Sequence, residues 1–182
     1  MNGLSDLKPK KQFDLIPYLT GGYESFKKEE GNPFADGNRW IKNMGLDGKI
    51  GITNNMTLDF TINPDFGQVE ADPAELNLTA YETYFVEKRP FFLEGNEIFD
   101  FTVNGNSLFY SRRIGSKPQF YPETEEDDFY THKSNTTILG SGKLTGRTRN
   151  GLSVGVLETV TSSEYGTTYH QHRKSTARLR YI

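Results

Sequence analysis

The sequence contains no cysteine, which excludes disulfide bonds, thiolate metal sites and cysteine nucleophiles. Its 21 basic and 24 acidic residues are interspersed and give a formal charge of −3, so the chain lacks the basic field that nucleic-acid binding requires. No stretch approaches the roughly 20 apolar residues of a membrane-spanning helix, a criterion that does not apply to the half-apolar strands of a transmembrane β-barrel. Residues 1–6 carry no basic region ahead of an apolar run, so no signal peptide is predicted within the chain.

The residues that are abundant favour β structure. Only 34% of the residues are hydrophobic, yet the chain holds 13 Phe, 10 Tyr and 18 Gly. Aromatic residues are enriched in strands and glycine is enriched in turns. We therefore expect an all-β, mainly antiparallel fold.

The clearest local pattern is a strict alternation of apolar and polar residues over residues 46–63. Leu46, Ile50 and Ile52 share one face before Asn54-Asn55, and the same alternation resumes after these two residues. Two such runs joined by two residues predict a β-hairpin, and asparagine tolerates the positive φ of a primed turn. The opposite face carries charged residues, which suits contact with water.

A second hairpin is predicted over residues 136–161, with its turn at Arg149-Asn150-Gly151. Its first strand places Ile138 and Leu144 opposite Lys143, and the apolar face of its return strand is interrupted by Glu158. Further strands are predicted at residues 12–20 and 175–182. The alternation of the last strand stops without a following strand to cover its edge, so we expect the chain to be a fragment of a longer protein.

The connection over residues 64–107 is far longer than a hairpin loop but too rich in large apolar side chains to be a solvated coil. It includes the run EKRPFFLEG at residues 87–95, which has neither a helical nor a strand period. Asp72 as N-cap and Pro73 at the first helical position predict a short helix from Pro73 to about Leu78 that ends before Pro90. The polar residues 115–135 are interpreted as an exposed acidic loop.

Strands of about 9 to 11 residues with one polar and one apolar face are those of a membrane barrel. The runs NPDFGQVEADPAELNLTAYETYFVEKRPFFLEGNEIF, LFYSRRIG and GKLTGRTRNGLSVGVLETVT closely resemble a bacterial family of uncharacterised proteins. In that family a carbohydrate-binding module of the family-nine type precedes a C-terminal domain of unknown function that looks like an outer-membrane β-barrel. The matching segments span most of residues 8–161.

This resemblance implies that residues 1–182 are the N-terminal portion of an outer-membrane β-barrel with an ordered insertion. It further implies location in the bacterial outer membrane, contact with its lipid, and carbohydrate as a partner only through a module upstream of this chain. The expected role is structural or transport-like. Two alternatives remain open: a membrane-associated hydrolase acting on glycans, and a soluble β-sandwich binding module.

Under the barrel interpretation, the insertion folds inward as a plug or caps one mouth of the pore. Its arginines would then pair with its carboxylates, because a guanidinium group fits a carboxylate in two parallel hydrogen bonds. The alternative is that these charges only hold the loop in place. The candidate residues are Glu70, Asp72, Glu87, Arg89, Glu94, Arg112 and Arg113.

The carboxylates Asp65, Glu70, Asp72 and Glu75 have two other interpretations, as oxygen ligands of a hard cation or as an acid and base pair for glycoside hydrolysis. Their spacing lacks the central glycine of an EF-hand loop. His170 and His172 would share one strand face, but two ligands do not make a metal site. We therefore assign no catalytic residue and predict neither a metal nor another cofactor.

Overall fold

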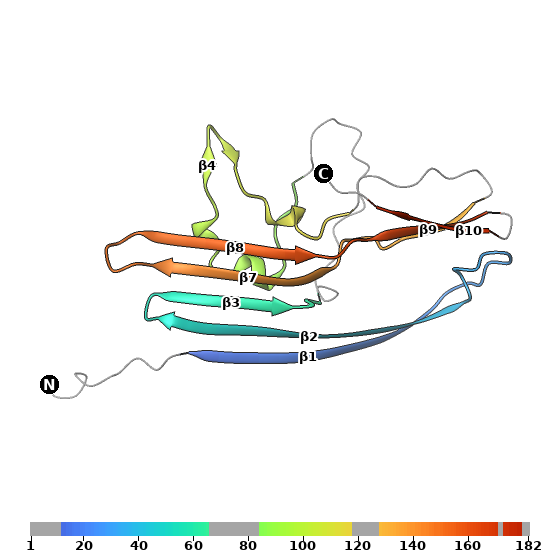
Figure 1. The fold of residues 1–182 in the computed structure, drawn as a ribbon, viewed down its shortest axis with the longest axis horizontal. Coiled ribbons are helices and arrows are strands. Elements are labelled where there is room, and N and C mark those ends of the chain that lie inside the picture. The colour runs from blue at the N-terminus through green and yellow to red at the C-terminus, as the bar shows by residue number, and fades with distance from the viewer. Residues whose placement is uncertain (1–11, 66–83, 118–127, 171–172, 180–182) are drawn as a thin grey trace.

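The computed structural model describes residues 12–65, 84–117, 128–170 and 173–179, and every strand pair within these ranges is antiparallel (Figure 1). The predicted predominance of antiparallel strands is thus confirmed. The larger sheet has five strands in the order β1-β2-β3-β7-β8. These strands are β1 (Phe13–Ser25), β2 (Asn38–Thr53), β3 (Met56–Ile62), β7 (Ile138–Arg147) and β8 (Ser153–Thr161).

The remaining elements are short. A three-stranded sheet has the order β10-β9-β6, from β6 (Phe129–Thr131), β9 (Tyr165–His170) and β10 (Arg173–Arg178), and β4 (Thr102–Val103) pairs with β5 (Asn106–Ser107). The helical elements are single turns: α1 (Pro90–Leu93), η1 (Asn96–Ile98) and η2 (Ser111–Arg113). Across the described residues, no helix has the length and apolar character needed to cross a membrane.

The hairpin predicted over residues 46–63 is confirmed as β2 and β3, but the reason given for its turn is wrong. Within the described ranges, the only residues other than glycine with positive φ are Asn63 and Asn104, so Asn54-Asn55 does not form a primed turn. The register instead shifts between Gly51 and Thr53. This bulge adds twist near the turn and replaces the left-handed residues that the two-residue link was expected to supply.

The second predicted hairpin is also confirmed, as β7 and β8. Gly151 has φ 85° and donates its N–H to the carbonyl of Thr148, 3.0 Å away, so the turn uses the glycine that the sequence offers. The simple alternation fails at the start of β7, where the register shifts between Ile138 and Gly140. The bulge buries Ile138 and leaves Leu139 exposed.

Three sequence expectations concern the long connections. The helix predicted over residues 73–78 lies outside the described residues. The end of that helix before Pro90 stays a prediction, and a separate single turn, α1, begins at Pro90, because proline is well suited to the first helical position. The stretch 115–135 is not entirely an exposed loop, since it contributes β6, whose Phe129 and Tyr130 are half-buried.

The two faces of the five-stranded sheet differ in chemistry, as the register shows. One face, here called the polar face, carries charged and hydroxyl side chains and is covered near its centre. Its central residues are Lys49 on β2, Thr57, Asp59 and Thr61 on β3, and Ser141, Lys143 and Thr145 on β7. Among the described residues, buried side chains are mostly polar, and the buried hydrophobic ones are Phe92, Ile138 and Leu179.

The opposite face, here called the apolar face, is largely open to its surroundings. Leu19 is 77% exposed and Trp40 is 70% exposed, although both are large hydrophobic residues. The apolar face comprises Phe13, Leu15, Leu19, Tyr23, Trp40, Met44, Leu46, Ile50, Leu58, Phe60, Ile62, Leu144, Val154, Val156 and Val160, together with Lys42 and Glu158. Most large hydrophobic residues of this sheet therefore lie on its open face, whereas the covered centre of the other face is polar.

Phe60 lies flat across the neighbouring strand on the apolar face. A Cβ added to Gly48, its register partner, would lie 2.2 Å from the Phe60 ring. Gly142, the partner of Phe60 on the other side, has no atom within 4 Å of an added Cβ. Glycine is thus required at position 48 by the aromatic ring and not by the backbone.

We expect Gly48→Ala to lower the free energy of unfolding by about 1–3 kcal/mol, because the ring must leave its place. Gly142→Ala, in the same row of the same sheet, is the matched control and should be nearly neutral. The measurement is urea unfolding of the refolded protein followed by circular dichroism. Equal effects of the two substitutions would contradict the packing argument.

Candidate functional site

The segment of residues 84–117, here called the covering segment, lies against the polar face and against β8. A Cβ added to Gly155 on β8 would lie 2.4 Å from the Ile98 side chain, and one added to Gly95 would lie 3.2 Å from the Thr145 hydroxyl. In Figure 1 this segment is drawn in green and yellow beside β7 and β8. Small residues therefore allow the backbone of the covering segment and the sheet to approach closely.

Lys143 is the central contact between the sheet and the covering segment. It is 2% exposed, and its ammonium group donates to the carbonyl oxygens of Phe91, at 2.5 Å, and of Glu94. These carbonyls belong to the end of α1, where a helix has unsatisfied acceptors and favours a cation. The ammonium also lies 4.9 Å from the centre of the Phe91 ring. A lysine of the sheet thus holds the backbone of the covering segment.

Asp59 stands between two lysines of the polar face. Its carboxylate is 4.0 Å from the Lys143 ammonium and 3.7 Å from that of Lys49. Lys49 in turn binds the carboxylate of Glu94, on the covering segment. Two ammonium groups and two carboxylates therefore balance in charge, which offsets part of the cost of burying Lys143 and Asp59.

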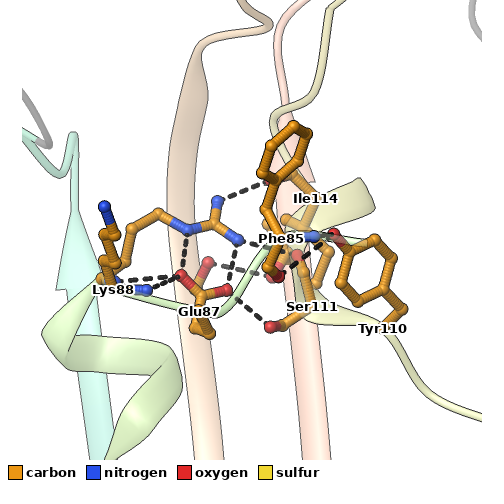
Figure 2. Close-up of polar contacts among 9 residues, drawn as sticks. Phe85, Glu87, Lys88, Tyr110, Ser111 and Ile114 are labelled. Carbon is orange, nitrogen blue, oxygen red and sulfur yellow. Dashed lines mark hydrogen bonds and ion pairs between the residues drawn. The ribbon is translucent and has the colours of Figure 1, made fainter. Parts of the chain in front are cut away.

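Glu87 and Arg89 form a second polar centre, within the covering segment (Figure 2). The guanidinium donates to both carboxylate oxygens, from Nε at 2.8 Å and from a terminal nitrogen at 2.7 Å. Both side chains are almost fully buried, at 7% exposed for Arg89 and 8% for Glu87. The backbone N–H groups of Lys88 and Arg89 also donate to Glu87, so the carboxylate fixes the turn that leads into α1.

The same pair joins distant parts of the covering segment. Arg89 donates to the carbonyl oxygens of Ser111, at 2.7 Å, and Ile114, at 2.6 Å, while its guanidinium lies 4.2 Å from the centre of the Phe92 ring. The Ser111 hydroxyl donates to Glu87 at 2.5 Å. Nearby, the Tyr110 hydroxyl accepts from the Phe85 N–H at 2.7 Å. These bonds tie residues 85–92 to residues 110–114.

The environment of Glu87 changes the acidity of its carboxyl group. Burial by itself would raise the pKa of Glu87, but the hydrogen bonds from Arg89 and Ser111 outweigh burial and hold the pKa below its ordinary value of 4.5. The group is therefore ionised at neutral pH and serves as an anionic acceptor for five donors.

The covering segment contains most of the charged residues that the sequence singled out. Glu87 and Arg89 come together, whereas Glu94 contacts Lys49 of the sheet and not an arginine. Arg112 and Arg113 lie in η2, beside Ser111, and the Arg113 guanidinium is 5.8 Å from the centre of the Tyr110 ring. Glu70 and Asp72 lie outside the described residues.

The residues considered as metal ligands are dispersed or already engaged. Asp65 accepts from the Thr20 hydroxyl at 2.5 Å, and Glu75 and His172 lie outside the described residues. His170 is 2.5 Å from Asp128, and the His132 ring stacks on Tyr130. No group of three potential metal-ligating His, Asp or Glu side chains occurs among the described residues.

Sequence reasoning did not select Lys49, Asp59 and Lys143 as a group. Their signal is a charged residue at corresponding positions of three alternating strands, and the register places Asp59 opposite both lysines. The group can be recognised only when the pairing of β3 with β7 is known, because the two strands are far apart in the sequence. Chemically, the arrangement neutralises charge and holds the covering segment on the sheet.

Fold and site together define a mainly antiparallel β protein whose polar sheet face is covered by an ordered segment. A model of the family described as a domain of unknown function (DUF5916) matches residues 9–181, so the chain belongs to this family. No curated protein and no solved structure matches the chain.

The Glu87–Arg89 centre yields a stability prediction. Arg89→Ala leaves a buried carboxylate without its cation, so we expect a loss of about 3–5 kcal/mol in the free energy of unfolding. Arg39→Ala is the control, because it removes an exposed ion pair with Glu24 and should cost at most about 1 kcal/mol. Limited proteolysis and thermal unfolding of both variants provide the measurement, and similar behaviour of the two would contradict the assigned role.

The acidity of Glu87 yields a pH prediction. Because its pKa is lower in the folded than in the unfolded protein, its ionisation stabilises the fold above its ordinary pKa of 4.5. This contribution is lost as the pH falls from that value through the lower folded-state pKa. The stability difference between the wild type and Glu87→Gln should therefore shrink over this window in acid denaturation series. A stability difference that does not change with pH over this window would contradict the assigned ionisation of Glu87.

Proposed function

We propose that the five-stranded sheet is part of the wall of an outer-membrane β-barrel and that the covering segment is its plug. One observation carries this proposal: the polar face of the sheet is buried beneath an ordered segment while the apolar face is exposed. A transmembrane barrel wall has this distribution, with apolar residues toward lipid and polar residues toward the interior. The role that follows is structural or transport-like, with outer-membrane lipid as the partner of the apolar face.

The exposure of the apolar face supports contact with lipid. In water, each Å² of exposed apolar surface costs about 25 cal/mol relative to burial. Soluble proteins therefore rarely expose large contiguous apolar patches. Here apolar side chains extend from Phe13 on β1 across the sheet to Val160 on β8. In the bilayer the same surface needs no protein partner.

The contacts of the covering segment support a plug that is held in place. Lys143 binds backbone carbonyls and Lys49 binds Glu94, so wall and segment meet through charge-assisted bonds at mid-strand. The Glu87–Arg89 centre keeps the segment folded on itself. Ordered backbone within a barrel interior is tolerated where its polar groups are paired in this way.

The two alternatives receive less support. A soluble β-sandwich would bury Phe13, Leu19 and Trp40 beneath a second sheet, yet these side chains are exposed among the described residues. A hydrolase would use carboxylates of the insertion, but Glu70 and Asp72 lie outside the described residues and no observation favours catalysis. Carbohydrate binding through a module upstream of this chain stays a prediction of the family resemblance.

Arginine introduced on either face of β1 tests the lipid contact. Leu19, near the middle of β1, lies on the apolar face and Asp14 lies on the polar face, and both side chains are exposed. Leu19→Arg should reduce insertion by up to about 2–4 kcal/mol, the cost of arginine on the lipid face near the bilayer centre. Asp14→Arg is the matched control and should insert normally.

The measurement is the folded fraction in lipid vesicles, read from heat-modified gel mobility. In a soluble protein both arginines would remain hydrated and neither would matter. Equal insertion of the two variants would therefore argue against a membrane wall.

A further inference from the structure

The connections between strands differ sharply at the two ends of the five-stranded sheet. At one end β2 and β3 are joined by Asn54-Asn55, and β7 and β8 by the tight turn of residues 148–152. At the other end lie the β1–β2 connection of residues 26–37, the points at which the connection of residues 63–137 leaves β3 and enters β7, and β9 and β10 (Figure 1). We call these the short-turn end and the long-loop end.

An aromatic pair marks the border of the apolar face toward the long-loop end. Tyr23 and Trp40 are register partners whose ring centres are 4.9 Å apart, and both are exposed. Tyrosine and tryptophan favour the boundary between hydrocarbon and head groups. The next pair on this face of the same strands is Ser25 with Asn38, which are polar and exposed. The change of chemistry places the membrane boundary at this level.

The long-loop end carries mainly polar side chains, which suit contact with water. Residues 26–37 contact the smaller sheet: a Cβ on Gly31 would lie 3.8 Å from the Phe129 ring, and the Lys174 ammonium is 5.9 Å from the centre of the Phe34 ring. β9 and β10 carry mainly threonine, tyrosine and basic residues, in the sequences YGTTYH and RKSTAR. The loop and the small sheet thus form one polar structure beyond the aromatic pair.

From these observations we infer that the long-loop end faces the cell exterior and the short-turn end faces the periplasm. Outer-membrane barrels have short periplasmic turns and longer external loops, because the periplasmic turns only reverse the chain. This inference rests on the proposed barrel function and adds its orientation. The polar structure of residues 26–37 and the small sheet then lies on the cell exterior.

The orientation has two functional consequences. The covering segment belongs to the connection between β3 and β7, and both strands meet this connection at the long-loop end, so the plug is joined to the sheet on the exterior side. β1 begins at the short-turn end, since Phe13 pairs with Ile50 near the β2–β3 turn. A polypeptide joined to the N-terminal side of β1 would therefore act in the periplasm and not on the cell surface.

Single cysteines test the orientation cleanly, because the chain has no cysteine of its own. Lys27→Cys and Glu30→Cys place exposed thiols at the long-loop end, and Asn55→Cys and Arg149→Cys place them at the short-turn end. Each variant of the full-length protein is produced in bacteria and treated with a maleimide on a polymer too large to cross the outer membrane, before and after permeabilisation. Heat-modified gel mobility checks that each variant is folded.

We expect the first two variants to react in intact cells and the other two only after permeabilisation. The reverse pattern would overturn the orientation and leave the barrel intact, as would failure of Lys27→Cys and Glu30→Cys to react until cells are permeabilised. Recovery of the protein in the soluble fraction, or reaction of all four variants in intact cells, would instead overturn the proposed function itself.

Discussion

The burial of charged groups on one face of a β-sheet is the constraint on which the rest of the structure depends. Lys143 is almost completely inaccessible, and a buried ammonium is tolerated only with acceptors and a counter-charge. Asp59 supplies the charge, and the carbonyls at the end of α1 supply the acceptors. The covering segment must therefore fold into a conformation that presents those carbonyls, and the Glu87–Arg89 centre stabilises that conformation.

The same constraint explains the inverted distribution of polarity. A sheet whose charged face is covered by a segment of matching polarity leaves its hydrophobic face outward, where the neighbour must be apolar. Lipid satisfies this requirement without any further polypeptide, which is why the proposed membrane wall and the proposed plug are two aspects of one arrangement. The covering segment also requires small residues on the sheet, since Gly155 lets Ile98 and Phe99 reach it.

Local patterns were good predictors wherever one strand pairs with the next along the chain. The alternation around Asn54-Asn55 and the glycine at position 151 located both hairpins, because side chains on a strand alternate with period two. They failed at the bulges near Thr53 and Leu139, where an extra residue changes which side chain faces inward. They did not indicate the single turn α1, which begins at Pro90, although proline is well suited to the first helical position.

The sequence by itself determined the antiparallel β class and the two polarities of the strands, since both follow from residues close together in the chain, but it did not decide which carboxylate binds Arg89. Only the tertiary structure decided that the polar face is the buried one and that Lys143 meets Asp59 and the end of α1. The physical reason is that an amphipathic strand is equally compatible with either face inward. The choice between them depends on what covers the sheet, and here that cover comes from a segment distant in sequence from β7.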